Sequence, residues 1–498
     1  MAEPLNALSP LDGRYYKRVK NAAQYFSEFS YIKHRVEVEI EYFISLITLV
    51  PPLEELNNVP VSDELLLSLR SIYNDFSLED AKWVKATEFH GGAEGGPPLA
   101  TNHDVKAVEY FVKYKLSQLS DTLEIAELGQ VTEFVHFGLT SQDINNTAVP
   151  AMTKRFILNE YIPELVKVIK ILDTYARKWA EIPLLARTHG QPASPTRMGK
   201  EFMVFVYRLR EQLVALDNVH HTAKFGGATG NFNAHRVAYP DVDWMKFADE
   251  LVEHLGLRRQ QVTTQIENYD HSAALFQAVV RINNILIDLC RDVWTYISMG
   301  HFRQKTKAGE IGSSAMPHKV NPIDFENAEG NLGIANAILQ HLANKLPISR
   351  LQRDLTDSTV TRNIGVPFGH SLVSLKSIQK GLGKLILDEE KVKEELEHHW
   401  EVTAEAIQTI LRREQIHGAY EILKQETRGA VVTEESIERF IKKLEEDESL
   451  NLAAEVVAEL RGITPFSYTG YFDPGAPLND HLKAELKEST FKMIAKYT

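Results

Sequence analysis

Apolar side chains recur at intervals of three and four residues over long stretches of the chain. Between residues 157 and 179 they form one continuous stripe, which predicts an amphipathic helix that buries a single face. Residues 202–216 repeat the pattern. Residues 274–299 are apolar on most faces, which is typical of a helix enclosed by other helices.

Proline placement supports the same interpretation, because a proline inside a helix kinks or breaks it. Residues 241–316 and 368–464 contain none. Alternation of apolar and polar residues bounded by hairpin turns, the mark of β-hairpins, is scarce. We therefore predict a mostly α fold in which long helices form a central bundle.

Three helical regions are predicted in chain order, at 1–131, 132–370 and 371–498. The second region contains the long helices and therefore the central bundle. It ends at the Gly-Val-Pro-Phe-Gly sequence of residues 365–369, where two glycines and a proline predict a turn.

The two flanking regions have different patterns. The first holds an amphipathic helix around 26–49, a Pro-Pro break at 51–52 and a glycine-rich loop at 91–98. The third is rich in Glu and Lys on helical spacing, at 391–397 and 434–446, and we expect these charges to form solvated helix faces.

Charge and cysteine content narrow the class of protein. The 498 residues include 55 Lys and Arg against 68 Asp and Glu, and a formal charge of -13 disfavours a general nucleic-acid binder. A small anionic substrate needs only a local cluster of basic residues. Cys290 is the only cysteine, and the sequence shows neither a secretory signal nor a long uninterrupted apolar run. We expect a cytoplasmic protein that binds neither membranes nor nucleic acid.

The stretch 312–322, Gly-Ser-Ser-Ala-Met-Pro-His-Lys-Val-Asn-Pro, carries the strongest chemical signal. Its glycine, serines and prolines cannot continue a helix, so it forms a loop between a helix ending near Met299 and one beginning near Asp324. A surface connection is the simple alternative. A serine acts as a general base only if its alkoxide is stabilised, which a nearby ammonium and backbone N–H groups would do.

Three other polar stretches lie between the predicted helices. Residues 187–193 place His189 in a turn bounded by glycine and proline, just before a helix starting near Thr196. A histidine hydrogen-bonded to the backbone is the structural alternative there. Residues 101–104 and 136–143 are typical of helix N-caps, and a helix N-terminus is also a site where a carboxylate can bind.

Motifs for phosphate loops, dinucleotide binding and zinc hydrolysis are absent. Instead, residues 313–321 resemble the Ser-Ser-x-Met-Pro-x-Lys-x-Asn signature of the fumarase/aspartase superfamily, whose members cleave C–N or C–O bonds and release fumarate. The resemblance runs from Ser9 to at least Arg428. Residues 101–111, 230–235 and 353–360 are similar to a bacterial-type subgroup that acts on succinylated purine nucleotides.

This resemblance implies a homotetramer whose central helices pack together and whose sites combine loops from three subunits. It implies small nucleotide substrates and neither a metal nor an organic cofactor. His189 and Ser313 would then come from different chains. Two stretches depart from the family pattern: the glycine-rich segment at 91–98 is longer than usual, and the segment after about residue 428 matches less clearly.

The resemblance also implies roles for individual residues. Ser313 matches the general base that removes a proton beside a carboxylate, and His189 matches the general acid that protonates the departing nitrogen. Lys319 and Asn321 would hold that carboxylate. The remaining substrate contacts implied are Arg14, Tyr15, Arg353, Ser358 and Arg362 at the phosphate and nearby groups, Thr140, Ser141 and Gln265 at the succinyl carboxylates, Asn102 and Asn327 as further polar contacts, and His103 and Asp104 for orienting His189 or the substrate.

Alternatives stay open at this point. Arg353 and Arg362 could instead form surface salt bridges with Asp354 and Asp357. Within the superfamily, argininosuccinate lyase, fumarase and aspartase share the loop at 312–322. A helical protein without catalytic activity, with a structural or binding role, is the alternative from a different class.

Overall fold

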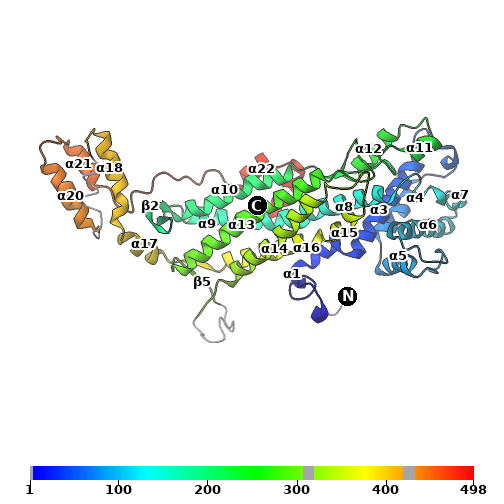
Figure 1. The fold of residues 1–498 in the computed structure, drawn as a ribbon, viewed down its shortest axis with the longest axis horizontal. Helices are drawn as coiled ribbons and strands as arrows, with labels where there is room; N and C mark the ends of the chain where they lie inside the picture. The colour runs from blue at the N-terminus through cyan, green and yellow to red at the C-terminus, as the bar shows by residue number, and fades with distance from the viewer. Residues whose placement is uncertain (1–3, 307–318, 419–431, 498) are drawn as a thin grey trace. The chain divides into compact units, whose positions relative to one another are not determined.

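The computed structural model describes residues 4–306, 319–418 and 432–497 (Figure 1). Helices dominate these residues, so the predicted mostly α fold is confirmed. Strands in the described residues form three short two-stranded sheets. The sheets pair β1 (Pro183–Thr188) with β2 (Gln191–Arg197), β3 (Thr222–Ala223) with β4 (Arg258–Arg259), and β5 (Phe302–Gln304) with β6 (Leu385–Leu387).

The chain divides into two compact units, each made of three segments. The first comprises Met1–Glu164, Gln212–Asn284 and Gly330–Ser374, and the second comprises Leu165–Glu211, Ile285–Glu329 and Leu375–Thr498. The predicted division into three regions, with boundaries at residues 131 and 370, is a different way to divide the chain and stays a prediction. Five long helices contribute residues to both units: α9 (Ile162–Lys178), α10 (Met198–Asp217), α13 (Asp270–Ser298), α14 (Ile323–Lys345) and α16 (Gly365–Leu382).

In the first unit, helix α3 (Glu28–Ile47) packs against its neighbours α4, α6 and α8. It starts where the Ser27 side chain accepts a hydrogen bond from the Ser30 N–H, and it buries Tyr42 and Phe43 completely. The other helices of this unit are α1 (Tyr16–Val19), α2 (Ala23–Phe26), α4 (Asp63–Asn74), α5 (Leu78–Phe89), α6 (Asp104–Leu123), α7 (Ala126–Gln130), α8 (Ser141–Phe156), α11 (Asn233–Ala238), α12 (Trp244–His254) and α15 (Thr356–Thr361).

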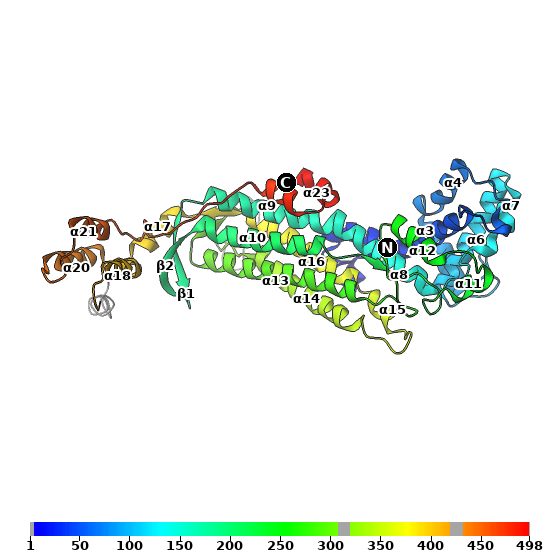
Figure 2. The ribbon, with the colours of Figure 1, turned by 90° about the horizontal axis from the view of Figure 1, so that it is seen from above.

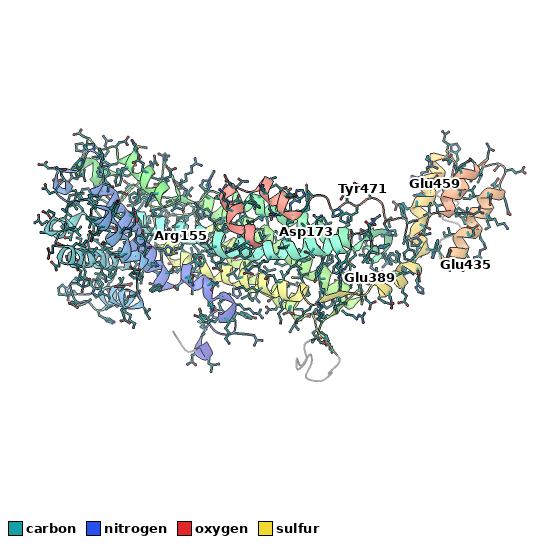
Figure 3. The ribbon with its side chains drawn as sticks, turned by 180° about the vertical axis from the view of Figure 1, so that it is seen from behind. Arg155, Asp173, Glu389, Glu435, Glu459 and Tyr471 are labelled. Atoms are coloured by element: carbon teal, nitrogen blue, oxygen red, sulfur yellow. The ribbon has the colours of Figure 1, made fainter. Side chains whose placement is uncertain are left out.

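In the second unit, the helices α18, α20 and α21 enclose a small core of their own, to which Leu411, Phe440 and Leu460 contribute. Charged side chains of both predicted runs are exposed, such as Lys393 in 391–397 and Glu435 in 434–446, and Figure 3 shows Glu435 on α20. The charge runs therefore form solvated faces, as predicted. The helices of this unit are α17 (Glu389–Glu397), α18 (Ala404–Arg413), α20 (Glu434–Glu446), α21 (Ala454–Arg461), α22 (Leu478–Glu485) and α23 (Glu488–Ile494).

The segment with α22 and α23 lies beside α9 and α10 (Figure 2). From α9, Arg177 donates hydrogen bonds to the carbonyls of Gly475, at 3.1 Å, and Ala476. From α10, Arg210 forms an ion pair with Glu485 of α22. Polar anchors at both ends of α22 thus fix this C-terminal segment within the second unit.

The turn predicted over residues 365–369 is wrong, because α16 begins at Gly365. A Cβ at Gly365 would lie 2.5 Å from the Cβ of Phe26, and one at Gly369 would lie 2.9 Å from a methyl group of Leu11. These glycines permit close packing of the helix rather than a turn. Pro367 lies in the first helical turn, where its missing N–H has no partner to lose.

Helix α13 matches the apolar stretch expected over 274–299. One stripe of it is exposed and polar, at Gln277, Arg281, Asn284 and Asp288. Among the described helices, α13 is the one long and apolar enough to cross a membrane by length and composition, and 67% of its apolar window is buried in the structure. The buried core helix of a soluble protein satisfies the same criteria.

Candidate active site

His189 lies at the tip of the hairpin formed by β1 and β2. The antiparallel register pairs Thr188 with Gln191, so that His189 and Gly190 make the turn by themselves. Their φ angles are 54 and 75, the left-handed backbone that such a two-residue turn requires. A non-glycine residue in this conformation costs on the order of 1 kcal/mol. The strain is a reason to suspect a functional role for the histidine.

The imidazole of His189 is exposed, and in the described part of the chain it has no hydrogen-bond partner. The alternative of a structural histidine bonded to the backbone is therefore not supported by the described residues. The following helix, α10, begins at Met198, two residues later than predicted. The hairpin itself was missed, because the sequence of β1 lacks a clear alternation of apolar and polar residues.

Side chains from elsewhere in the second unit hold both strands of the hairpin. In β1, Arg187 forms an ion pair with Glu395 of α17. In β2, the Nε of Arg197 donates to the Oγ1 of Thr469 at 3.1 Å. The hairpin is thus held at its base by Arg197 and next to its turn by Arg187, whose Nη1 also donates to the carbonyl of Gly190 at 3.3 Å, while the side chain of His189 stays exposed.

The N-terminus of α8 carries the predicted cap at Thr140. Its N–H donates to the Oδ2 of Asp143 at 2.8 Å, and the Asp143 N–H donates to the Thr140 carbonyl at 2.9 Å. Ser141 is the first residue of the helix and is half-buried. The free N–H groups and the helix dipole make this end favourable for an anion.

A completely buried ion pair joins Asp143 of α8 to Lys224. The Nζ of Lys224 lies 2.7 Å from the Oδ1 of Asp143, and both side chains are 0% exposed. The same carboxylate oxygen accepts the N–H groups of Gly226 and Gly227 at 2.8 and 3.1 Å. Burial lowers the pKa of Lys224, the Asp143 carboxylate opposes that effect, and the charge of Arg353 adds to it.

Four polar side chains join the N-terminal end of α8 to α15 and to the loop before α13. Arg353 donates from Nη1 to the Oε1 of Gln265 at 3.1 Å and from Nη2 to the Oγ of Ser358 at 3.4 Å. The Nε2 of Gln142 donates to the same Ser358 oxygen at 3.3 Å. The structure therefore brings Gln265, Arg353 and Ser358 together, although the resemblance implied a different part of the substrate for Gln265 than for the other two. The Nε of Arg353 is buried without a partner among the described residues.

Asp104 and Arg362 form a second group in the same unit. The Oδ2 of Asp104 accepts from the Nη2 of Arg35 at 2.7 Å and from the Nη2 of Arg362 at 2.9 Å. Burial raises the pKa of Asp104, but the Arg35 and Arg362 charges and hydrogen bonds outweigh it and hold that pKa below its usual value. Arg362 also pairs with Glu28 at 3.2 Å.

The alternative salt bridges for the two arginines are not observed among the described residues. Asp354 pairs with Arg350 at 2.9 Å, and Asp357 is a buried acceptor for Tyr269. At the start of α6, the Oδ1 of Asp104 accepts the N–H of Val105 at 2.9 Å, so an aspartate caps this helix as expected. The Nδ1 of His103 accepts a second free N–H, from Lys106, at 3.1 Å.

The other predicted residues lie in separate places. Arg14, Lys319 and His103 are exposed, whereas Tyr15 and Asn321 are half-buried. Asn102 precedes α6 with a positive φ of 46. In the second unit, the Oδ1 of Asn327 accepts from the Ser377 hydroxyl at 2.9 Å. Ser313 lies outside the described residues, and so do its neighbours Ser314 and His318.

Sequence reasoning missed the buried partners that hold this site. Arg35 lies inside a predicted amphipathic helix, where a charged residue on the apolar face was the available signal. Asp143 belongs to the stretch 136–143, whose pattern predicts only a helix cap. Lys224, Asn146 and Tyr269 carried no local signal, because their partners are distant in sequence.

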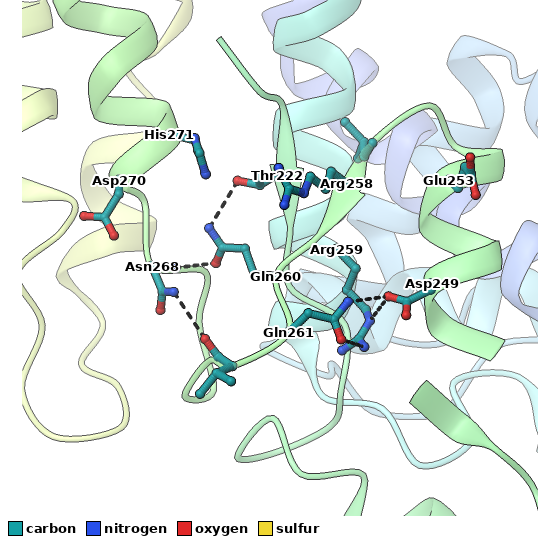
Figure 4. Close-up of a pocket in the computed structure, with 12 residues that line it drawn as sticks. Thr222, Asp249, Glu253, Arg258, Arg259, Gln260, Gln261, Asn268, Asp270 and His271 are labelled. Atoms are coloured by element: carbon teal, nitrogen blue, oxygen red, sulfur yellow. Dashed lines mark hydrogen bonds and ion pairs between the residues drawn. The ribbon is translucent and has the colours of Figure 1, made fainter. Parts of the chain in front are cut away.

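A separate polar pocket lies in the first unit, between α12, β4 and the start of α13 (Figure 4). Its volume is about 490 Å³, and Arg258, Gln260 and His271 contribute to its wall. None of the predicted site residues lines it. Within the described residues, no group of three or more His, Cys, Asp or Glu side chains could hold a metal ion.

Comparison with known proteins adds two family matches. A family model described as lyase matches residues 33–337, and one described as adenylosuccinate lyase C-terminal matches residues 349–469. The second match extends the similarity past residue 428. Residues 470–498, which include α22 and α23, lie beyond both matched stretches.

Curated relatives match over nearly the whole chain. The adenylosuccinate lyase of Dictyostelium discoideum is 53% identical over 473 residues, which is 94% of this chain and 97% of that one. The enzymes of the same name from Vibrio cholerae and Escherichia coli K12 are 48% and 47% identical, with the same coverage.

Solved structures show the fold class independently. The 3-carboxy-cis,cis-muconate lactonizing enzyme of Pseudomonas putida aligns with a TM-score of 0.65 at 18% identity, over 96% of this chain and 97% of that one. A fumarate lyase from Mesorhizobium sp. BNC1 gives the same values. At this identity the likeness supports the helical fold and no statement about substrate.

Breaking the buried pair at α8 should destabilise the protein. Lys224→Met leaves the Asp143 carboxylate buried without a cation, so the free energy of unfolding should fall by about 3 kcal/mol. Denaturant unfolding followed by circular dichroism measures the change. The double variant Asp143→Asn with Lys224→Met removes both charges and should recover part of the loss. A single variant as stable as wild type would contradict the importance of this pair.

Proposed function

The chain belongs to the adenylosuccinate lyase family of the fumarase/aspartase superfamily, and on this premise we propose that it eliminates fumarate from adenylosuccinate, leaving AMP. The related succinyl-aminoimidazole-carboxamide ribotide would lose fumarate in the same way and leave the carboxamide ribotide. One observation carries the proposal: relatives with this name match 94% of the chain at up to 53% identity. The enzyme is a carbon–nitrogen lyase of purine nucleotide biosynthesis.

The proposed reaction begins with removal of a proton from the carbon beside a succinyl carboxylate. Ser313 takes this proton, and the electron pair spreads into the carboxylate, where Lys319 and Asn321 stabilise the charge. The C–N bond then breaks, the pair forms the double bond of fumarate, and His189 donates a proton to the departing nitrogen. A histidine suits this step because its pKa lies near neutrality.

The environment of His189 supports its role as the acid. A tight turn with a strained backbone presents its ring to solvent, and no described side chain competes for its proton. Both strands of the hairpin are anchored, so the ring starts from a defined position. His103 and Asp104 remain proposed as residues that orient His189 or the substrate, and Asn102 as a substrate contact.

The anionic parts of the substrate require local positive charge in a protein with a net charge of -13. We assign the phosphate and nearby groups to Arg14, Tyr15, Arg353, Ser358 and Arg362. The unpartnered Nε of Arg353 and the fork geometry of arginine support this assignment. We assign the succinyl carboxylates to Thr140, Ser141 and Gln265, with Asn327 as an additional polar contact.

A cytoplasmic homotetramer with sites shared between subunits is proposed from the same family. Gly330 and Gly333 lie in the middle of α14, both are exposed, and a Cβ on either would meet nothing within 4 Å. A glycine inside a helix costs about 1 kcal/mol relative to alanine, which the described chain does not offset. Close approach of a helix from another subunit would account for both glycines, and for the exposure of Ile334 beside them.

Purified protein should release fumarate from adenylosuccinate, because relatives named for this reaction match 94% of the chain. Absorbance of the nucleotide and of fumarate measures the reaction without added metal or organic cofactor. Argininosuccinate, malate and aspartate serve as the comparison substrates and should release none. Release from one of these but not from adenylosuccinate would contradict the proposal, and so would activity that chelator removes and zinc restores.

The two adjacent serines of the loop should differ in their effect on turnover. Ser313→Ala should abolish nearly all turnover while substrate binding stays measurable, since a proton acceptor acts mainly in the transition state. Ser314→Ala is the matched control and should be milder. Steady-state kinetics and substrate binding by calorimetry measure both. A dead Ser314→Ala with a near-native Ser313→Ala would invert the assignment.

Two inactive variants should complement each other if the sites are shared. His189→Gln and Ser313→Ala, mixed, dissociated and reassembled, should regain partial activity, because some hybrid sites receive both intact residues. Mixing without subunit exchange is the control and should restore nothing. Native mass measurement confirms that hybrid tetramers form. Confirmed exchange with no recovered activity would show that the sites are not shared in this way.

A further inference from the structure

Tyr269 is a buried polar residue that the proposed reaction does not use. It directly precedes α13 and is 3% exposed, and its φ of 61 lies in the left-handed region. A bulky side chain rarely adopts this backbone, so surrounding contacts must hold it there. Its hydroxyl forms two of these contacts, both of them hydrogen bonds.

The hydroxyl of Tyr269 makes one hydrogen bond of each kind. It accepts from the Nδ2 of Asn146 at 2.7 Å and donates to the Oδ2 of Asp357 at 3.2 Å. Both partners are buried, at 2% and 3% exposed. Asn146 belongs to α8 and Asp357 to α15, so a single oxygen atom connects two helices that are distant in sequence.

The loop before α13 is tied to the same point. The Oδ1 of Asn146 accepts the N–H of Glu267 at 2.9 Å, so that both ends of one amide are used. Glu267 lies two residues from Gln265, and Asp357 is the direct neighbour of Ser358. Each element that meets at Tyr269 therefore carries a residue assigned above to the substrate, with Ser141 on α8.

We propose that Tyr269 is a positioning residue, whose buried hydroxyl sets the relative placement of the substrate-binding side chains on α8, α15 and the loop between residues 260 and 269. The proposal rests on the assignment of Ser141, Gln265 and Ser358 to the substrate. Tyr269 itself acts through Asn146 and Asp357.

The chemistry of the hydroxyl suits this purpose better than packing alone would. Burial, together with the charge of Asp357, raises the pKa of Tyr269 well above its ordinary value, so the hydroxyl keeps its proton and donates it at neutral pH. A phenylalanine would fill the same space and break both bonds. The Asn146 amide and the Asp357 carboxylate would then each lose a partner in a buried place, and could regain one only by moving.

Tyr269→Phe in the full-length enzyme tests this inference. With adenylosuccinate as substrate, KM should rise about tenfold, with a much smaller change in kcat, because the displaced groups bind substrate and transition state alike. Tyr161→Phe is the matched control: Tyr161 is 0% exposed in the same unit, and its hydroxyl has no partner among the described residues. Its KM and kcat should stay within about twofold of wild type.

Thermal unfolding of both variants separates positioning from stability. A lower melting temperature in Tyr269→Phe with an unchanged KM would show a merely structural role and overturn the inference. Turnover by wild type and by Tyr161→Phe reports on the proposed function independently, because failure of that function removes activity from both. A KM that rises in Tyr269→Phe but not in Tyr161→Phe supports the positioning role of Tyr269.

A second variant covers the case in which Tyr269→Phe does not fold. Asp357→Asn keeps the shape of the side chain and weakens the same bond, so its KM should rise severalfold at a near-native melting temperature. Where both single variants fold, the double variant should have the KM of the more severe single one. The inference would be overturned if the fold-changes in KM of the two single variants multiply in the double variant, or if Asp357→Asn leaves KM unchanged.

Discussion

The buried carboxylate of Asp143 is the group on which the order of the first unit depends. It receives the Lys224 ammonium, the Gly226 and Gly227 N–H groups and, through its second oxygen, the N–H of Thr140. An ion pair in such a place adds little net stability, because desolvation offsets the attraction. Its effect is geometric: it fixes a glycine-rich loop against the N-terminus of α8, where no apolar contact could specify the distance.

This geometry has an electrostatic consequence. The protein is acidic overall, yet Arg353 and the N-terminus of α8 place positive charge in one part of the first unit, where Asp143 already neutralises the buried Lys224 ammonium. Each cation is held by a defined partner: Asp143 for Lys224, and Gln265 with Ser358 for Arg353. Groups ordered in this way bind an anion at a small entropic cost, since their side chains have little freedom left to lose.

Local sequence patterns predicted the helices and the candidate functional side chains. They failed where contacts between residues distant in sequence determine the local structure. The helices α9, α10 and α13 follow from apolar periodicity alone. The supposed turn at 365–369 failed because Gly365 serves close packing against Phe26, which no local pattern reveals. The bonds from Lys224 to Asp143 and from Tyr269 to Asp357 span 81 and 88 residues. Motif resemblance supplied the proposed substrate-binding residues, but not the buried groups that contact them.

Two features of the isolated chain each cost conformational free energy that no described contact offsets. His189 adopts a left-handed backbone and points an unpartnered imidazole to solvent, and Gly330 with Gly333 weakens the middle of α14 on an exposed face. A general acid needs a partner that orients its ring, and a glycine pair in a helix needs a close neighbour. The proposed tetramer would supply both from further copies of the chain, and would thereby explain the strain at His189 and the exposed glycines of α14 by one cause.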